Sequence, residues 1–156
     1  MNPLESTWAM DWGWSLPLIL LNVLTHVFGL AMINDAVVGR LKDRSGRRTS
    51  MFKVTGITGI AVLLMIVLHW LEAATWAIAY RMLDALPDIK TAMLFSLGAM
   101  TGFGASNVSL PPHWQMMGVL QSLAGLLLFG LTTAFMFAMI QSVWPAQSGH
   151  DPGNKV

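Results

Sequence analysis

The chain has no cysteine among its 156 residues, and only 11% of its residues are charged. The absence of cysteine excludes disulfides, thiolate catalysis and metal sites with thiolate ligands. Soluble domains carry roughly 25% charged residues, so the low charge predicts a protein with little surface in water. The sequence also lacks the His-Glu-x-x-His, Gly-x-Ser-x-Gly and phosphate-loop motifs. It therefore predicts a membrane protein that is not an enzyme.

Long apolar segments account for most of the chain. Hydrophobic residues make up 54% of it, and the mean hydropathy is +0.58. A spanning helix needs about 20 consecutive apolar residues. Three segments meet this requirement, at residues 16–38, 54–80 and 114–142. We expect an all-α membrane protein with three transmembrane helices in a lipid bilayer, and no nucleic-acid partner.

Positive charge is concentrated in residues 39–53. Six of the nine Lys and Arg residues lie between Arg40 and Lys53. Short basic loops face the cytoplasm, so this distribution predicts the orientation in an inner (plasma) membrane. Residues 1–15 then lie outside the cell, and the polar tail 143–156 is a disordered cytoplasmic segment. The first fifteen residues contain no Lys or Arg, and we expect no secretory signal there.

A fourth apolar segment, residues 90–100, is too short to cross a bilayer. It is followed by the glycine-containing tetrapeptide Thr101–Gly104 and then by the last long segment. Irregular backbone at membrane depth is tolerated only where protein or a water-filled cavity satisfies its polar groups. The order of these segments predicts a re-entrant helix and loop, entered from outside, rather than another span.

Two stretches of the chain resemble the tetrameric pore-loop cation channels, in their potassium-channel-like branch. Ala92-Met-Leu-Phe-Ser-Leu-Gly-Ala-Met-Thr-Gly-Phe-Gly104 resembles the pore helix and filter of that family. Ala124-Gly-Leu-Leu-Leu-Phe-Gly-Leu-Thr-Thr-Ala134 resembles its inner helix. The resemblance implies a pore module over residues 54–142, with an outer helix 54–80, pore helix 90–100, filter 101–104 and inner helix 114–142. It also implies a homotetramer that conducts K⁺ or Na⁺ and holds no resident cofactor.

The filter stretch departs from the family pattern Thr-Val-Gly-Tyr-Gly. Thr101 is followed directly by Gly102, so the filter is one residue short, and Phe103 replaces the tyrosine. Ala105 stands where the family has an aspartate. These departures leave open whether the pathway selects potassium or admits monovalent cations weakly.

The predicted ion-binding residues are Thr101, Gly102, Phe103 and Gly104. Glycine permits the left-handed backbone angles that a carbonyl-lined filter requires. Four copies around one axis would give rings of carbonyl oxygens that replace the water around a cation. The alternative for this stretch is an ordinary glycine-rich turn outside the membrane.

Three further residues are assigned supporting roles in this interpretation. Glu72 is the one acidic residue deep in the second span, where an ionisable group is costly and usually functional or paired. We expect it to accept hydrogen bonds from backbone N–H groups behind the filter; the alternative is an interfacial carboxylate that reaches outward. Gly125 and Gly130 are candidate gating hinges, and close helix packing is the alternative for both.

Two other functions remain open at this point. His26 and His69 fall in the middle of two spans and could serve as the axial ligands of a haem in a redox protein. Buried histidines bonded to neighbours such as Asn22 or Thr25 are the simpler interpretation. The chain could also be a non-conducting membrane subunit that packs against a partner.

Overall fold

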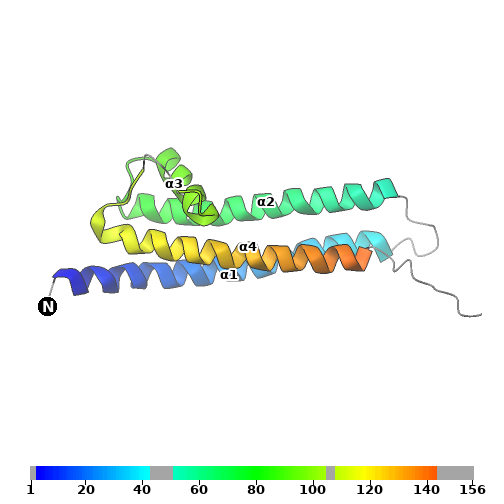
Figure 1. Ribbon diagram of the computed structural model, residues 1–156, viewed down its shortest axis with the longest axis horizontal. Helices are drawn as coiled ribbons and strands as arrows, with labels where there is room; N and C mark the ends of the chain where they lie inside the picture. The colour runs from blue at the N-terminus through cyan, green and yellow to red at the C-terminus, as the bar shows by residue number, and fades with distance from the viewer. Residues whose placement is uncertain (1–2, 43–50, 105–107, 144–156) are drawn as a thin grey trace, which may run out of the picture.

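The computed structural model describes residues 3–42, 51–104 and 108–143. Within these ranges the regular elements are helices. They are α1 (Pro3–Lys42), α2 (Met51–Met82), α3 (Ile89–Thr101), the short 3-10 helix η1 (Pro112–Trp114) and α4 (Gln115–Val143). Figure 1 shows α1, α2 and α4 side by side along the molecule, with α3 beside one end of α2. The predicted all-α class is confirmed.

Three of the helices are long and apolar enough to cross a membrane. The candidate spans are Trp8–Val37, Thr55–Met82 and Pro112–Gln141. Large apolar side chains on their outer faces remain exposed in the single chain, among them Leu24, Leu63 and Leu126. Lipid is the solvent in which such surfaces are stable. The chain is therefore a membrane-embedded protein, whereas its particular membrane and its orientation stay predictions.

Helix α1 begins earlier than the sequence analysis predicted. We expected a separate N-terminal segment over residues 1–15 and a span that starts at 16, but one helix runs from Pro3 to Lys42. Pro17 lies inside this helix rather than at its start. The boundary was placed at a change of composition, and such a change does not interrupt backbone hydrogen bonding. A proline removes one N–H donor, which long membrane helices tolerate.

The three long helices alternate in direction. α1 and α4 both begin at the end of the molecule where α3 lies, and α2 begins at the opposite end (Figure 1). The basic segment 39–53 connects α1 to α2 at that opposite end, with α1 ending at Lys42 and α2 beginning at Met51. Its middle, residues 43–50, and the tail from residue 144 lie outside the described residues, so the predicted loop and disorder are untested.

Helix α3 matches the short apolar segment of the prediction, with one more residue at each end. The N-cap is Asp88, whose carboxylate accepts hydrogen bonds from the Thr91 backbone N–H at 2.9 Å and the Thr91 hydroxyl at 2.7 Å. The first of these bonds satisfies one of the free backbone N–H donors of the first helical turn. These hydrogen bonds to the ionised form hold the pKa of the Asp88 carboxyl below its usual value.

The buried side chains form clusters at different levels of the bundle. The cluster under α3 includes Trp76, Tyr80, Trp114 and Met117, together with apolar residues of the α2–α3 connection. A second cluster, which includes Leu30, Met65 and Met139, joins α1, α2 and α4 farther toward the basic segment. Between them, Met100 of α3 packs with Ala73 and Leu128. α3 is thus packed into the bundle, with its C-terminal end directed inward along α2 and α4.

Candidate functional site

The predicted filter residues lie at the C-terminal end of α3. Thr101 is the last helical residue, and its hydroxyl donates to the Leu97 carbonyl of the same helix at 2.8 Å. Gly102 ends the helix in the left-handed conformation, with φ of 69°, and Gly104 follows with φ of 75°. The loop therefore starts after Thr101 rather than at it. Both left-handed positions suit glycine, because other residues carry a steric cost there.

The backbone of this turn is exposed in the single chain. The Gly104 N–H donates to the Gly98 carbonyl at 3.0 Å, which folds the turn back against α3. Thr101, Gly102, Phe103 and Gly104 are all exposed, and Phe103 retains 90% of its side-chain and backbone area. The following residues, 105–107, lie outside the described part of the chain. The turn is thus a surface available to a neighbouring molecule.

A buried chain of hydrogen bonds fixes α3 to both of its neighbours. The Ser96 hydroxyl donates to the Ala73 carbonyl of α2 at 2.6 Å. The Gln121 side-chain amide of α4 donates to the Ser96 hydroxyl at 2.6 Å and to the Ser96 carbonyl at 3.2 Å. The Tyr80 hydroxyl of α2 donates to the Gln121 amide oxygen at 2.8 Å. All these side chains are buried, so the network determines how far α3 reaches into the bundle.

The two candidate hinge glycines differ in their surroundings. A Cβ added at Gly125 would collide with the Met100 backbone, so this glycine permits the close approach of α3 to α4. A Cβ added at Gly130 would meet nothing within 4 Å. The geometry therefore gives Gly125 a packing role, which was the alternative interpretation of the sequence. It leaves bending at either position untested.

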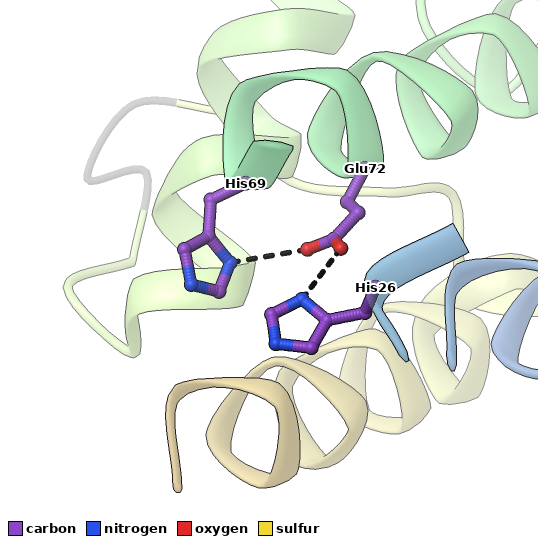
Figure 2. A group of neighbouring side chains, drawn as sticks. All are labelled: His26, His69 and Glu72. Atoms are coloured by element: carbon purple, nitrogen blue, oxygen red, sulfur yellow. Dashed lines mark hydrogen bonds and ion pairs between the residues drawn. The ribbon is translucent and has the colours of Figure 1, made fainter. Parts of the chain in front are cut away.

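Glu72 is fully buried in α2, and its partners differ from the predicted ones. We expected backbone N–H groups behind the filter. Instead, its two carboxylate oxygens face two imidazoles (Figure 2): Oε1 lies 2.7 Å from His26 Nδ1, and Oε2 lies 3.1 Å from His69 Nδ1. The prediction identified a paired carboxylate but assigned it the wrong partner. The imidazole of His26, from α1, meets Glu72 Oε1, and both side chains are fully buried between the two helices.

His26 and His69, on separate helices, belong to the same cluster. The centroids of their rings are 5.2 Å apart, and the Nε2 atoms of both approach the Thr132 hydroxyl oxygen of α4, at 3.1 and 3.0 Å. His26 is fully buried as expected, but its partners are Glu72 and Thr132 rather than Asn22 or Thr25. We call the four side chains of His26, His69, Glu72 and Thr132 the polar ring.

Next to the polar ring, further hydrogen bonds connect α1 and α2. The Thr75 hydroxyl lies 2.7 Å from both the Asn22 side-chain oxygen and the Glu72 carbonyl. Neither Thr132 nor Thr75 was named as a site residue from the sequence. The available signal was the presence of several polar residues within otherwise apolar spans, since each requires a partner inside the membrane.

The donor atoms of the polar ring are close enough together to raise the question of a bound metal ion or haem. One donor atom from each of His26, His69 and Glu72 lies within 4.8 Å of the others. However, all four ring nitrogens already contact the Glu72 carboxylate or the Thr132 hydroxyl, which accounts for the arrangement without a cation. Haem ligation would require each imidazole to leave one of these contacts, and this alternative stays a prediction.

Three other buried polar atoms lie nearer the α3 end of the bundle. Among the described residues, Asp11 Oδ1, Ser15 Oγ and Trp76 Nε1 have no hydrogen-bond partner. Asp11, Ser15, Asn22 and His26 recur at spacings of four and seven residues and are all buried, so they mark the inward face of α1. These four polar side chains of α1 are thus directed at α2 and α4 rather than at lipid.

Comparisons with family models, curated proteins and solved structures gave no match to this chain.

Proposed function

We propose that this chain forms a homotetrameric channel for monovalent cations, with α3 as a re-entrant pore helix and the turn at residues 101–104 at the ion pathway. The observation that carries the proposal is an exposed glycine turn halfway along the apolar helices. The resemblance to pore-loop cation channels in the same residues supports it independently of the geometry.

The depth of the turn follows from the contacts of α3. The Met100 backbone lies against Gly125, which is 13 residues beyond Pro112 in the 30-residue span that ends at Gln141. At 1.5 Å per residue this places the end of α3 about 20 Å along the span. Gly102, two residues later, is therefore near the middle of the apolar layer.

Exposed, irregular backbone at that depth is incompatible with a single chain in lipid. The Gly102 and Gly104 N–H groups bond back to α3, but hydrocarbon cannot satisfy the backbone groups of the turn that remain exposed, and each unsatisfied group costs several kcal/mol on the order-of-magnitude scale for apolar solvents. Protein from a second copy, or water in a cavity between copies, would satisfy them. One turn cannot enclose a pore, whereas copies related by a cyclic axis can. Four copies is the number in the family that the sequence resembles.

The chemistry expected of this turn is cation coordination by backbone carbonyls. Gly102 and Gly104 permit the backbone angles needed to direct carbonyl oxygens toward a common axis. α3 and α4 carry one cationic side chain between them, Lys90 at the start of α3, so little positive charge opposes a cation at the turn. A cation that enters would exchange water for carbonyl oxygens there.

The experiment compares two exposed phenylalanines, one at the turn and one at the end of the bundle where α2 begins. Phe103 is 90% exposed at the turn, and Phe52 is 89% exposed near the start of α2. Purified protein in planar bilayers is measured under a sodium–potassium gradient, and its mass is measured in detergent. We expect four copies, a measurable current, and a reversal potential that Phe103→Ala shifts and Phe52→Ala leaves unchanged.

Three results would contradict this proposal. A monomer would leave the turn in lipid and remove the argument from depth. A tetramer without current would support the non-conducting subunit instead. Identical reversal potentials for the wild type and Phe103→Ala would show that the ion pathway does not run past the turn.

A further inference from the structure

The polar ring is a closed cycle of contacts between three helices. His26 comes from α1, His69 and Glu72 from α2, and Thr132 from α4. The Glu72 carboxylate joins the two Nδ1 atoms, at 2.7 and 3.1 Å. The Thr132 hydroxyl joins the two Nε2 atoms, at 3.1 and 3.0 Å. Each imidazole therefore has one contact at each of its nitrogens, as Figure 2 shows for the Glu72 side.

A count of protons shows what this cycle requires. An ionised carboxylate only accepts, so both Nδ1 atoms must carry hydrogen. The two Nε2 atoms then share the Thr132 hydroxyl, which has a single hydrogen and a further acceptor in the Leu128 carbonyl of its own helix, at 3.1 Å. If both imidazoles were neutral, one Nε2 lone pair would face the hydroxyl oxygen with no hydrogen between them. One additional proton, on either Nε2, makes all four contacts hydrogen bonds when the hydroxyl donates to the other Nε2 in place of the Leu128 carbonyl.

The same number of protons also satisfies the cycle when they are distributed differently. If Glu72 is protonated, it donates to one Nδ1, and each imidazole is then neutral with a single N–H. The direction of every hydrogen bond around the cycle stays consistent. In both arrangements the two imidazoles and the carboxyl together hold three protons, and the net charge of the polar ring is zero.

The surroundings favour this neutral state. Glu72 and His26 are fully buried, and a net charge at this depth in an apolar layer is costly. The nearest charged residues along the same helices are Asp35 on α1 and Arg81 on α2, each nine residues away, or about 14 Å. Helix α4 has no Asp, Glu, Lys or Arg, and α3 has only Lys90 at its far end. The ring's own groups must therefore balance their charge.

We propose that the polar ring is a proton-binding site that holds one exchangeable proton at neutral pH and joins α1, α2 and α4 through it. The unfolded chain at pH 8 would carry an ionised Glu72 and two neutral imidazoles, one proton fewer. Folding is therefore coupled to uptake of that proton. His69 is the part-exposed imidazole, with 12% of its side chain accessible, and it is the ring's point of exchange with the surroundings. This inference does not depend on ion conduction.

Glu72→Gln is the variant that removes the need for the additional proton. The amide oxygen accepts from one Nδ1–H and the amide N–H₂ donates to the other Nδ1, so the cycle closes with two neutral imidazoles and no additional proton. The side chain keeps its size. Asp35→Asn makes the same chemical change at an exposed acidic residue of α1 outside the ring, and it is the matched control.

The first measurement counts the protons in the full-length protein in lipid nanodiscs at pH 8. Imidazole ¹⁵N shifts of His26 and His69, with the carboxyl ¹³C shift of Glu72, give the protonation of each group. We expect three protons on these groups in the wild type and in Asp35→Asn. Two protons in the wild type would overturn the proposal, even if the variant did not fold.

The second measurement follows stability against pH. Since the folded state holds one proton more, the unfolding equilibrium constant of the wild type should rise about tenfold per pH unit above pH 8, relative to Glu72→Gln. Asp35→Asn should behave as the wild type does. Equal pH dependence in the wild type and Glu72→Gln would overturn the proposal. One equivalent of zinc per purified chain, lost in Glu72→Gln, would also overturn it, because a divalent cation would then replace the proton.

Discussion

The Met100 carbonyl, one residue from the end of α3, faces the side of Gly125 on which any other residue would carry its Cβ. This contact brings the backbones of α3 and α4 together midway along the bundle. Small residues permit such approaches between membrane helices. The position of the exposed turn therefore depends on one missing side chain in α4.

Gly125→Ala should displace α3. The added Cβ would collide with the Met100 backbone, which cannot rotate away as a side chain can. Overpacking of this kind costs about 1–3 kcal/mol. We expect a lower thermal midpoint in detergent and greater protease access to the 101–104 turn. Gly130→Ala is the control, because its Cβ would meet nothing within 4 Å. Equal midpoints for the two variants would contradict the packing role.

Tyr80→Phe should weaken the attachment of α3 without changing its shape. The change leaves the Gln121 amide oxygen buried with no donor, since the Tyr80 hydroxyl is the donor that it accepts from. An unsatisfied buried group costs about 1–3 kcal/mol. Thermal unfolding measures the effect. Ser122→Ala removes a hydroxyl that bonds only its own helix, at the Gly118 carbonyl, and should change stability by less than about 0.5 kcal/mol. A larger loss for the control would argue against the network.

The N-cap of α3 should give the protein an acid-sensitive step. Hydrogen bonds from Thr91 lower the pKa of Asp88 from its usual value of 3.8, so the ionised cap stabilises the folded state above that pH. The contribution should disappear as the pH falls below 3.8 through the lower pKa of the folded state. Asp88→Ser keeps a cap that does not titrate. The difference in thermal midpoint between wild type and Asp88→Ser should decrease as the pH is lowered below 3.8. A difference that does not change with pH would exclude a stabilising role of the ionised cap.

The positions of the helices could be predicted from local sequence. The long apolar runs and the short segment before Gly102 are local properties of neighbouring residues, and both were recovered within a few residues, apart from the start of α1. The glycines also indicated a left-handed turn, since φ values of 69° and 75° favour residues without a side chain. Local composition and steric freedom are sufficient for predictions of this kind.

Which residues meet depends on how the helices pack in three dimensions. The contacts of the polar ring join residues 46, 63 and 106 positions apart, from three helices. The spans are apolar on nearly all sides, so the sequence gives little indication of which face turns inward. That face is set by the approach and rotation of the packed helices, as at Met100 and Gly125. This is why Glu72 could be recognised as paired from the sequence, while its histidine partners could not.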